Sequence, residues 1–390
     1  MGTDAWRNWR AFDEKQYDSE DFDDELHSDV PFYGGQVTFG PYSLATVIRN
    51  TETVGPSVIL HASRHTQLVR DPVVDGKLAM SDWSAYHGGT MTDEIAALVS
   101  LELGVRLRVA GTARLSGIHE KREPRRPPLY FEVPRLANPG RPNRELIPMA
   151  KLRTADLSGL ARLKSFPAIG EPAQAELVRA ARAYSAGLWW ANEDPNQAWL
   201  LFVTAAETAA TCRQLLSADP IDLLREHWSQ MWNAIQSADA DAQVQIANLL
   251  AEQMKATRRF IDFVVQCAPE APAVRPQFDQ FDWEKLRKHA STIYGYRSKA
   301  LHEAKPFPMP MFEAPRLDAA GAIQEIPSGL NSSGLGGIWK AAEAPMLLST
   351  FEYIIRGALL SWWDELALAA QDSPEAPEAP ETPETPETPE

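Results

Sequence analysis

Apolar residues in the second half of the chain recur at the three- to four-residue spacing of an α-helix. Asp194-Pro195 and Asp219-Pro220 each supply an N-cap followed by a proline suited to the first helical turn. The predicted apolar faces are formed by Leu177, Ala181, Tyr184 and Leu188; Ala198, Leu201, Phe202, Ala205, Ala209 and Cys212; Leu224, Trp228, Met231 and Ile235; Val244, Ala247, Leu250 and Met254; Leu286, Ala290 and Ile293; and Leu347, Phe351, Ile354, Ala358 and Trp362. Residues 170 to 372 are therefore predicted to form an all-α bundle of six helices.

Residues 31 to about 165 follow a different pattern, with short β-branched and aromatic runs interrupted by glycine, proline and asparagine. These runs contain Val37, Phe39, Leu44, Val47, Ile48, Val58, Ile59 and Leu60. Thr90 and Asp93 then have the spacing of a capping box, and Gly104 closes the helix that follows. We predict an α+β domain whose role the sequence does not specify.

The two ends of the chain differ from both of these parts. Residues 1 to 30 alternate acidic residues with aromatic ones, which predicts a solvated, partly disordered leader or an arm that docks on a basic surface of the same protein. Residues 373 to 390 repeat Pro, Glu and Thr and are predicted to be disordered, because such a segment buries no core.

The formal net charge of −15 comes mostly from these two ends. Residues 1 to 29 hold ten acidic and three basic residues, and residues 373 to 390 hold six glutamates and no base. The remaining 37 acidic and 35 basic residues leave residues 30 to 372 nearly neutral. The charge of the whole chain therefore does not exclude a nucleic-acid partner.

The cysteine content and the N-terminus indicate a cytoplasmic protein. Cys212 and Cys267 are the only cysteines, and both fall within helical patterns, so a disulfide framework is not expected. The N-terminus lacks the basic start and apolar run of a signal peptide, and no window approaches the roughly 18 apolar residues of a membrane span.

Arg297 occupies an unusual position in the penultimate predicted helix, which begins near Asp282. Leu286, Ala290 and Ile293 mark the apolar face of that helix, and Arg297 is the next position on it. A guanidinium keeps its proton, so on an inward face it must meet a carboxylate, a carbonyl or a phosphate.

His302 follows Arg297 by five residues, which corresponds to a rotation of roughly 140° on an ideal helix. One straight helix therefore does not direct both side chains at one atom. Either the chain bends near Lys305, or two copies of the chain face each other and combine their pairs. Arg114 and His119 have the same spacing, but they lie in a loop-like basic segment, so the helical context favours Arg297 and His302.

Glu207 is the only acidic residue on a helix that is apolar nearly all round, between Ala198 and Ala210. A carboxylate in a central helix needs a counter-charge. Arg297 is the candidate that would complete a functional site, whereas pairing with another cation would make Glu207 a purely structural residue.

Positive charge is densest between Arg106 and Pro128. This run contains Arg106, Arg108, Arg114, Lys121, Arg122, Arg125 and Arg126. It is typical of a solvated loop, and it also offers Arg122, Arg125 and Arg126 as candidates for contacts with the phosphates of RNA.

Other common sites have no support in the sequence. His61 and His65 have no third metal ligand of suitable type nearby, and no phosphate-binding Gly-Lys-Ser/Thr loop or Gly-x-Ser-x-Gly elbow is present. Neither a metal nor a cofactor is therefore expected. Tyr86-His87 in a glycine turn leaves open a third hypothesis, in which the N-terminal domain is itself an enzyme.

The helical half resembles the HEPN superfamily, particularly its Apea-like branch. The resemblance rests on Ala205-Ala-Glu207, on Tyr296-Arg-Ser-Lys-Ala-Leu-His302 about 90 residues later, and on the long last helix. It implies a dimeric, metal-independent endoribonuclease of the kind found in phage defence or toxin systems, although many members of the superfamily are catalytically silent. By this resemblance Arg297 and His302 would be the catalytic pair, and Ser298 would be the polar residue of the motif, where Asn, Asp or His is commoner.

RNA cleavage suits these residue types. The 2′-hydroxyl of RNA is its own nucleophile, so His302 would move protons while Arg297, supported by Glu207, binds the phosphate. Lys299, between the two motif residues, is a further candidate for RNA binding. The expected partners are RNA, a second copy of the chain and a trigger at the N-terminal domain. The alternative is a non-catalytic HEPN-like module that binds a nucleotide, RNA or a protein.

Overall fold

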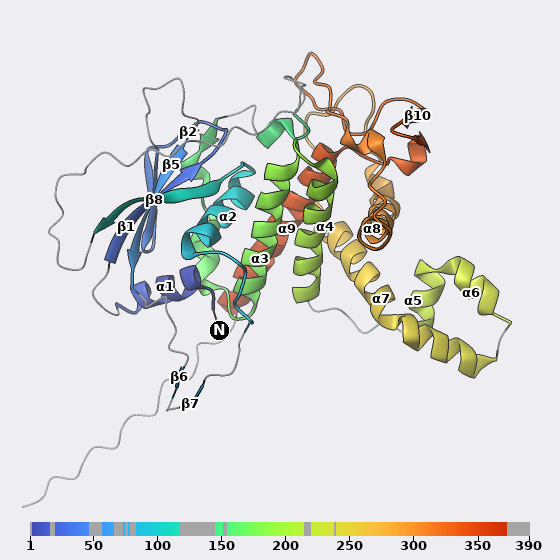
Figure 1. The fold of residues 1–390 in the computed structure, drawn as a ribbon, viewed down its shortest axis with the longest axis horizontal. Coiled ribbons are helices and arrows are strands. Elements are labelled where there is room, and N and C mark those ends of the chain that lie inside the picture. The colour runs from blue at the N-terminus through green and yellow to red at the C-terminus, as the bar shows by residue number, and fades with distance from the viewer. Residues whose placement is uncertain are drawn as a thin grey trace, which may run out of the picture.

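A computed structural model provides the structure of the chain (Figure 1). It describes residues 2–15, 20–46, 57–65, 73–74, 77–78, 83–116, 145–150, 154–213, 220–237 and 239–372. An N-terminal sheet region is followed by a helical region, as the sequence predicts. The predicted disordered tail, residues 373 to 390, lies outside the described residues.

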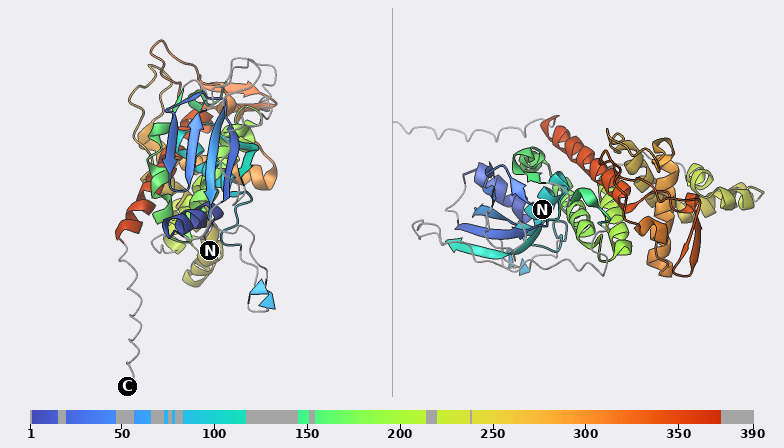
Figure 2. Two further views of the ribbon diagram at one scale, coloured as in Figure 1. Left: turned by 90° about the vertical axis from the view of Figure 1, so that its left-hand side faces the viewer. Right: turned by 90° about the horizontal axis from the view of Figure 1, so that it is seen from above.

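The main sheet has five strands in the order β3-β4-β5-β1-β8, and every neighbouring pair is antiparallel. The strands are β1 (Glu20–His27), β3 (Gln36–Phe39), β4 (Tyr42–Thr46), β5 (Ser57–Arg64) and β8 (Arg108–Ser116). In Figure 2 one face of this sheet is turned to the viewer and the helices lie behind it. The strands predicted from Val37, Leu44 and Leu60 are therefore confirmed.

The helix α2 (Met91–Leu103) lies against the sheet and is also confirmed. Thr90 and Asp93 form the predicted capping box, and Gly104 ends the helix in the left-handed conformation at φ 64°. The hydroxyl of Thr92 donates to Asp24 on β1 at 2.5 Å, which fixes the helix to the sheet.

The interpretation of residues 1 to 30 as a partly disordered leader is wrong for the described part of that segment. Residues Asp4–Asp13 form helix α1, and β1 is paired on both sides, by β5 and β8. Acidic side chains of β1 find partners on β5. Asp23 bonds to His61 at 2.8 Å, and Asp21 accepts from Ser63 at 2.6 Å. Phe22 and Leu26 are the only apolar residues of β1 and lie four positions apart, so the acidic residues hid the strand pattern.

Short strands accompany the main sheet. They are β2 (Phe32–Tyr33), which pairs in parallel with β9 (Ala155–Asp156), and the antiparallel pair β6 (Val73–Val74) and β7 (Lys77–Leu78). Short 3-10 turns include η1 (Pro148–Ala150), η2 (Leu157–Gly159) and η3 (Arg162–Ala168).

Seven α-helices follow in the described residues after position 172. They are α3 (Ala173–Trp190), α4 (Pro195–Cys212), α5 (Pro220–His227), α6 (Ser229–Ile235), α7 (Ala240–Gln266), α8 (Leu286–Glu303) and α9 (Leu348–Asp372). The predicted faces of the first and last are buried, from Leu177 to Leu188 and from Leu347 to Trp362. Figure 1 shows α3, α4 and α9 together beside α2, with α7 and α8 beyond them.

One helix of the prediction is wrong. Leu224, Trp228, Met231 and Ile235 were expected on one helix, but the chain breaks at Trp228 between α5 and α6. Met231 is consequently exposed. The apolar spacing continues across the break because α5 and α6 both pack with α7 in a small separate cluster around Leu224 and Ala247.

The long connection between α8 and α9 contains η5 (Met309–Phe312), η6 (Ala341–Glu343) and a β-hairpin of β10 (Asn331–Gly334) and β11 (Gly337–Lys340). Its tip has positive φ at both Leu335 and Gly336, as a tight two-residue hairpin turn requires. Gly334-Leu-Gly-Gly337 therefore forms the tip of this hairpin.

One hydrophobic core extends through both halves of the molecule, from Ala5 of α1 to Trp363 of α9. Polar contacts also join them: Arg162 pairs with Asp364 at 2.8 Å, and Arg356 donates to the carbonyl of Leu101 at 2.9 Å. In the part of the chain that is described, no helix is long and apolar enough to cross a membrane.

Candidate functional site

Glu207 lies on helix α4, which runs through the middle of the helical region. Asp194 caps its start by accepting from the backbone N–H of Gln197 at 3.1 Å, with Pro195 in the first turn. Its apolar residues are buried, and it packs against α3, α7, α8 and α9. Glu207 lies on the side of α4 that meets α7 and α8, where its side chain is 22% exposed.

Helix α8 presents Arg297 to this carboxylate. Leu286, Ala290 and Ile293 are buried, and Arg297 follows them on the same face. Its Nη2 donates to Oε2 of Glu207 at 2.8 Å, and its side chain is 24% exposed. The predicted pairing of Arg297 with Glu207 is therefore confirmed, and it lies at the edge of the core, within reach of solvent.

Tyr294 contacts both members of this pair. Its phenol hydrogen-bonds to Glu207, and the guanidinium of Arg297 lies over its ring at 5.5 Å from the centroid. Burial, followed by the charge and the hydrogen bond of Glu207, raises the pKa of Tyr294 to about 12. The phenol is therefore protonated near neutral pH and holds the carboxylate in place as a donor.

Arg259 brings a second guanidinium to the site from α7. Its charge reaches Tyr294, where it acts to lower the pKa of the phenol. Arg259 makes no hydrogen bond or ion pair with the residues that the structure describes, and its buried Nε and that of Arg297 are both unpartnered there. Two guanidiniums thus lie near Tyr294, and only that of Arg297 is paired with a carboxylate in the described residues, so an anion would balance the site.

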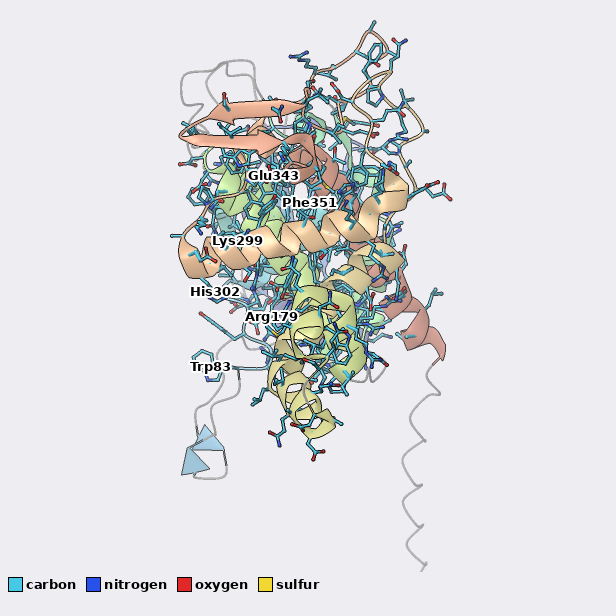
Figure 3. The ribbon with its side chains drawn as sticks, turned by 90° about the vertical axis from the view of Figure 1, so that its right-hand side faces the viewer. Trp83, Arg179, Lys299, His302, Glu343 and Phe351 are labelled. Carbon is cyan, nitrogen blue, oxygen red and sulfur yellow. The ribbon has the colours of Figure 1, made fainter. Side chains whose placement is uncertain are left out.

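The other motif residues follow on α8, and Figure 3 shows two of them, Lys299 and His302. Ser298 is half-buried, whereas Lys299 and His302 are exposed. The ammonium group of Lys299 lies 5.8 Å from the ring centroid of Tyr296, whose hydroxyl donates to the backbone carbonyl of Glu343 at 2.6 Å. This end of α8 is therefore held against the connection that precedes α9.

The imidazole of His302 does not meet Arg297 within the described chain. Helix α8 continues to Glu303, and the chain turns only at Ala304, in the left-handed conformation. On a continuous helix the two residues are about 7.5 Å apart along the axis and roughly 140° apart around it. A bend near Lys305 comes after both residues, so it does not bring them together.

The chain has no match among protein family models, curated proteins or solved structures. The resemblance of residues 170 to 370 to the HEPN superfamily therefore stays a prediction from the sequence motifs.

The structure describes only part of the basic stretch between Arg106 and Pro128. The candidates for RNA binding, Arg122, Arg125 and Arg126, lie outside the described residues. Arg106 is fully buried, pairs with Asp29 at 2.6 Å and donates to the carbonyl of Leu188 at 2.7 Å. The prediction of a solvated loop is therefore wrong at Arg106, where the charge belongs to a structural ion pair.

The loop before α2 carries an exposed aromatic pair, of which the sequence pointed only to Tyr86. Trp83 and Tyr86 are 69% and 62% exposed, with ring centroids 5.4 Å apart at 87°. Arg179 on α3 donates to the carbonyls of Trp83 and Ser84 at 3.0 and 2.6 Å, which fixes the loop (Figure 3). Only the glycine turn beside Tyr86 marked this position in the sequence.

His87 in the same turn has a structural role. Its Nε2 lies 2.7 Å from Glu94, which is fully buried and accepts from the backbone N–H of Ala5 at 2.8 Å. Nothing in these contacts supports a separate enzyme in the N-terminal half. In the described residues, no three His, Cys, Asp or Glu side chains are grouped to hold a metal ion.

Proposed function

We propose that the protein is an endoribonuclease of the HEPN type that cleaves RNA by attack of the 2′-hydroxyl. The observation that carries the proposal is the site formed by Arg297, Glu207, Tyr294 and Arg259, in which two guanidiniums lie near Tyr294 and only that of Arg297 pairs with a carboxylate in the described residues. A phosphate would balance that excess of positive charge. His302, on the same helix, supplies an imidazole, a side chain that can both accept and donate a proton.

In the proposed reaction the 2′-hydroxyl oxygen attacks the neighbouring phosphorus and the bond to the 5′-oxygen breaks. The 2′-hydroxyl loses a proton and the departing 5′-oxygen gains one, so the products are a 2′,3′-cyclic phosphate and a 5′-hydroxyl. His302 transfers these protons, and Arg297 binds the phosphate oxygens as their charge grows. Ser298, Glu207 and Tyr294 belong to the surroundings that position Arg297.

We further propose that the active form is a homodimer. Because α8 is continuous past both residues, the imidazole and the guanidinium of one chain do not converge on one phosphate. Two copies related by a twofold axis would place His302 of each chain beside Arg297 of the other. The proposed setting is a defence or toxin system of the cytoplasm, in which the N-terminal half receives a trigger.

The test is His302→Ala in the full chain. His302 is exposed and lies in the last turn of α8, so the variant is expected to fold with an unchanged unfolding temperature. Cleavage of a labelled single-stranded RNA is expected to fall by about 100-fold or more, because proton transfer contributes roughly that factor. Lys305→Ala, an exposed cation just beyond the helix, is the matched control. A variant at His302 that cuts RNA at the parental rate contradicts the assignment.

The alternative function is a non-catalytic module that binds a nucleotide, RNA or a protein partner. The observation that favours it is the 2.8 Å pair of Glu207 and Arg297, which already neutralises one guanidinium without any ligand. Under this alternative the pair stabilises the contact between α4 and α8 and has no role in chemistry. Substitutions at the two residues separate these functions.

A further inference from the structure

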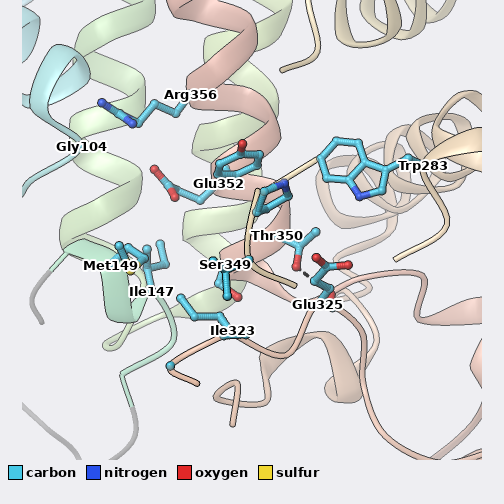
Figure 4. A pocket seen from close by; sticks show the side chains of 15 residues that line it. Gly104, Ile147, Met149, Trp283, Ile323, Glu325, Ser349, Thr350, Glu352 and Arg356 are labelled. Carbon is cyan, nitrogen blue, oxygen red and sulfur yellow. Dashed lines mark hydrogen bonds between the residues drawn. The ribbon is translucent and has the colours of Figure 1, made fainter. Parts of the chain in front are cut away.

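A cavity of about 360 Å³ lies where the two halves of the molecule meet, away from Arg297. Its walls come from the turn after α2 at Gly104, from Ile147 and Met149, from the start of α9, and from the loops on either side of α8 (Figure 4). This volume is in the range of small-molecule sites, which are usually apolar cavities with a few converging polar groups.

Polar side chains of α9 line one wall of the cavity (Figure 4). Ser349 and Glu352 are 8% and 7% exposed, and Arg356 follows Glu352 by one helical turn. The Oγ of Ser349 is buried and has no hydrogen-bond partner in the described residues. A hydroxyl in this state is costly unless a ligand or a water satisfies it.

Arg356 and Glu352, further along the same helix, offer complementary groups to the cavity. Arg356 donates from Nε and Nη2 to the carbonyls of Leu101 and Glu102 at 2.9 and 2.5 Å, and its Nη1 bonds to no described residue. Glu352 accepts from the hydroxyl of Tyr184 at 2.5 Å, and a carboxylate accepts several hydrogen bonds. This wall of the cavity thus presents a donor and an acceptor side by side.

Another wall of the cavity is aromatic and apolar. Trp283 and Tyr353 meet edge to face there, with ring centroids 6.2 Å apart at 84°. Pro272 and Val274 also line the cavity. Figure 4 shows Trp283 across the cavity from Arg356 and Glu352. Such a wall accommodates a flat ring.

The charges of the lining residues are balanced. Glu325 is held by Arg275, whose Nε donates at 3.0 Å, and by the backbone N–H of Phe281 at 2.6 Å. Glu352 and Arg356 supply one charge of each sign. An uncharged ligand therefore enters without leaving a buried charge unpaired.

We propose that this cavity binds a small, planar, uncharged heterocycle of the nucleobase type. An amide-like edge of such a ring would accept from Arg356 and donate to Glu352, with Ser349 as a third partner, while the ring packs against Trp283. The site goes beyond the proposed nuclease function and does not depend on it. Trp283 begins the 3-10 turn η4 (Trp283–Lys285) that continues directly into α8, so an occupant touches the start of the helix that carries Arg297.

The test measures binding of adenine, guanine, cytosine and uracil, and of their nucleosides, to the full chain by calorimetry and by the rise in unfolding temperature. At least one base is expected to bind saturably. Ile323→Trp, which fills the cavity from its wall, is expected to weaken that binding by at least tenfold. Ile338→Trp on the exposed hairpin adds the same ring elsewhere and is the matched control, expected to bind like the parent.

Ser349→Ala keeps the proposal testable if Ile323→Trp fails to fold. The hydroxyl bonds to no described residue, so its removal is expected to leave the unfolding temperature unchanged or slightly higher. Affinity for the base is expected to fall roughly twofold to tenfold, the worth of one hydrogen bond. The proposal is overturned if no base or nucleoside binds, or if Ser349→Ala and a folded Ile323→Trp both bind with the parental affinity. This experiment measures binding of a base and not cleavage of RNA. Its outcome is therefore independent of whether His302→Ala loses RNA cleavage.

Discussion

At the scale of single residues, the candidate site depends on how one carboxylate is shared. Glu207 accepts from Arg297 and from the phenol of Tyr294, so it orients both groups. It also competes with any phosphate for Arg297. In a site that only stabilises the fold, each charged group is expected to have a permanent partner, as Glu207 and Arg297 do. Arg259 has no ion pair with the described residues, and this feature points to an anion.

Arg297→Ala and Glu207→Gln distinguish a phosphate site from a structural pair. Arg297→Ala is expected to lower the free energy of unfolding by about 1–2 kcal/mol, less than for a fully buried pair because both side chains are about one quarter exposed. It is also expected to weaken binding of a 2′-O-methylated RNA, which lacks the nucleophile. Glu207→Gln removes the competing charge and is expected to strengthen that binding. Urea unfolding and fluorescence anisotropy measure the two effects, and unchanged RNA binding in both variants favours the structural alternative.

At the scale of elements, the proposed function leads us to expect single-stranded RNA at the loop that contains Trp83 and Tyr86, whose rings are exposed. Exposed aromatic rings stack on bases with little dependence on sequence, at about 1–3 kcal/mol for each base. The contacts of Arg179 hold this loop in one conformation, so little conformational freedom would be lost on binding.

Trp83→Ala is expected to lower the affinity for single-stranded RNA at least about fivefold. The cleavage rate at saturating RNA is expected to stay at the parental value, because Trp83 is on a different element from Arg297 and His302. Trp190→Ala is the matched control, since Trp190 is also an exposed tryptophan. Binding curves by anisotropy, with the His302→Ala background preventing cleavage, decide the outcome. Equal affinities of the Trp83 and Trp190 variants remove this loop from the RNA surface.

The elements that the sequence predicted correctly are those whose pattern is local. Strong apolar stripes, caps and prolines located α3, α4 and α9, and the stripe of α8 located Arg297 opposite Glu207. Arg259 was missed because the register of α7 against α8 depends on packing between helices. The strand β1 was missed because its acids find partners only in the folded sheet, on His61 and Ser63.

At the scale of the whole molecule, the two predicted domains share one hydrophobic core. Residues from α1, the sheet, η3 and the long helices belong to it together, and ion pairs and backbone contacts cross between the halves. Because the core is continuous, we expect the described part to unfold as one cooperative unit. Perturbation of a buried group in the sheet should therefore change the stability of the helical half as well.

His27 provides such a perturbation through pH. It is buried on β1, and burial, followed by the positive charge of Arg108, lowers its pKa below the usual 6.5, although a carboxylate oxygen of Glu25 lies 3.7 Å from its Nε2. The unfolded chain therefore binds a proton that the folded chain resists. The stability from neutral His27 is complete above about pH 6.5 and is lost as the pH falls towards the lower folded value, with a slope of at most about 1.4 kcal/mol per pH unit.

We expect His27→Gln to flatten this slope between pH 7 and 5, whatever it does to the stability at pH 7. Urea unfolding across that range measures the slope, and His302→Gln, at an exposed position of α8, is the matched control for removal of a histidine. Far-ultraviolet circular dichroism follows the helices and tryptophan fluorescence follows the core that both halves share. If the two signals unfold at different urea concentrations, the halves are separate units. If the slope of His27→Gln equals that of the parent, His27 takes up its proton equally well in the folded and unfolded chains.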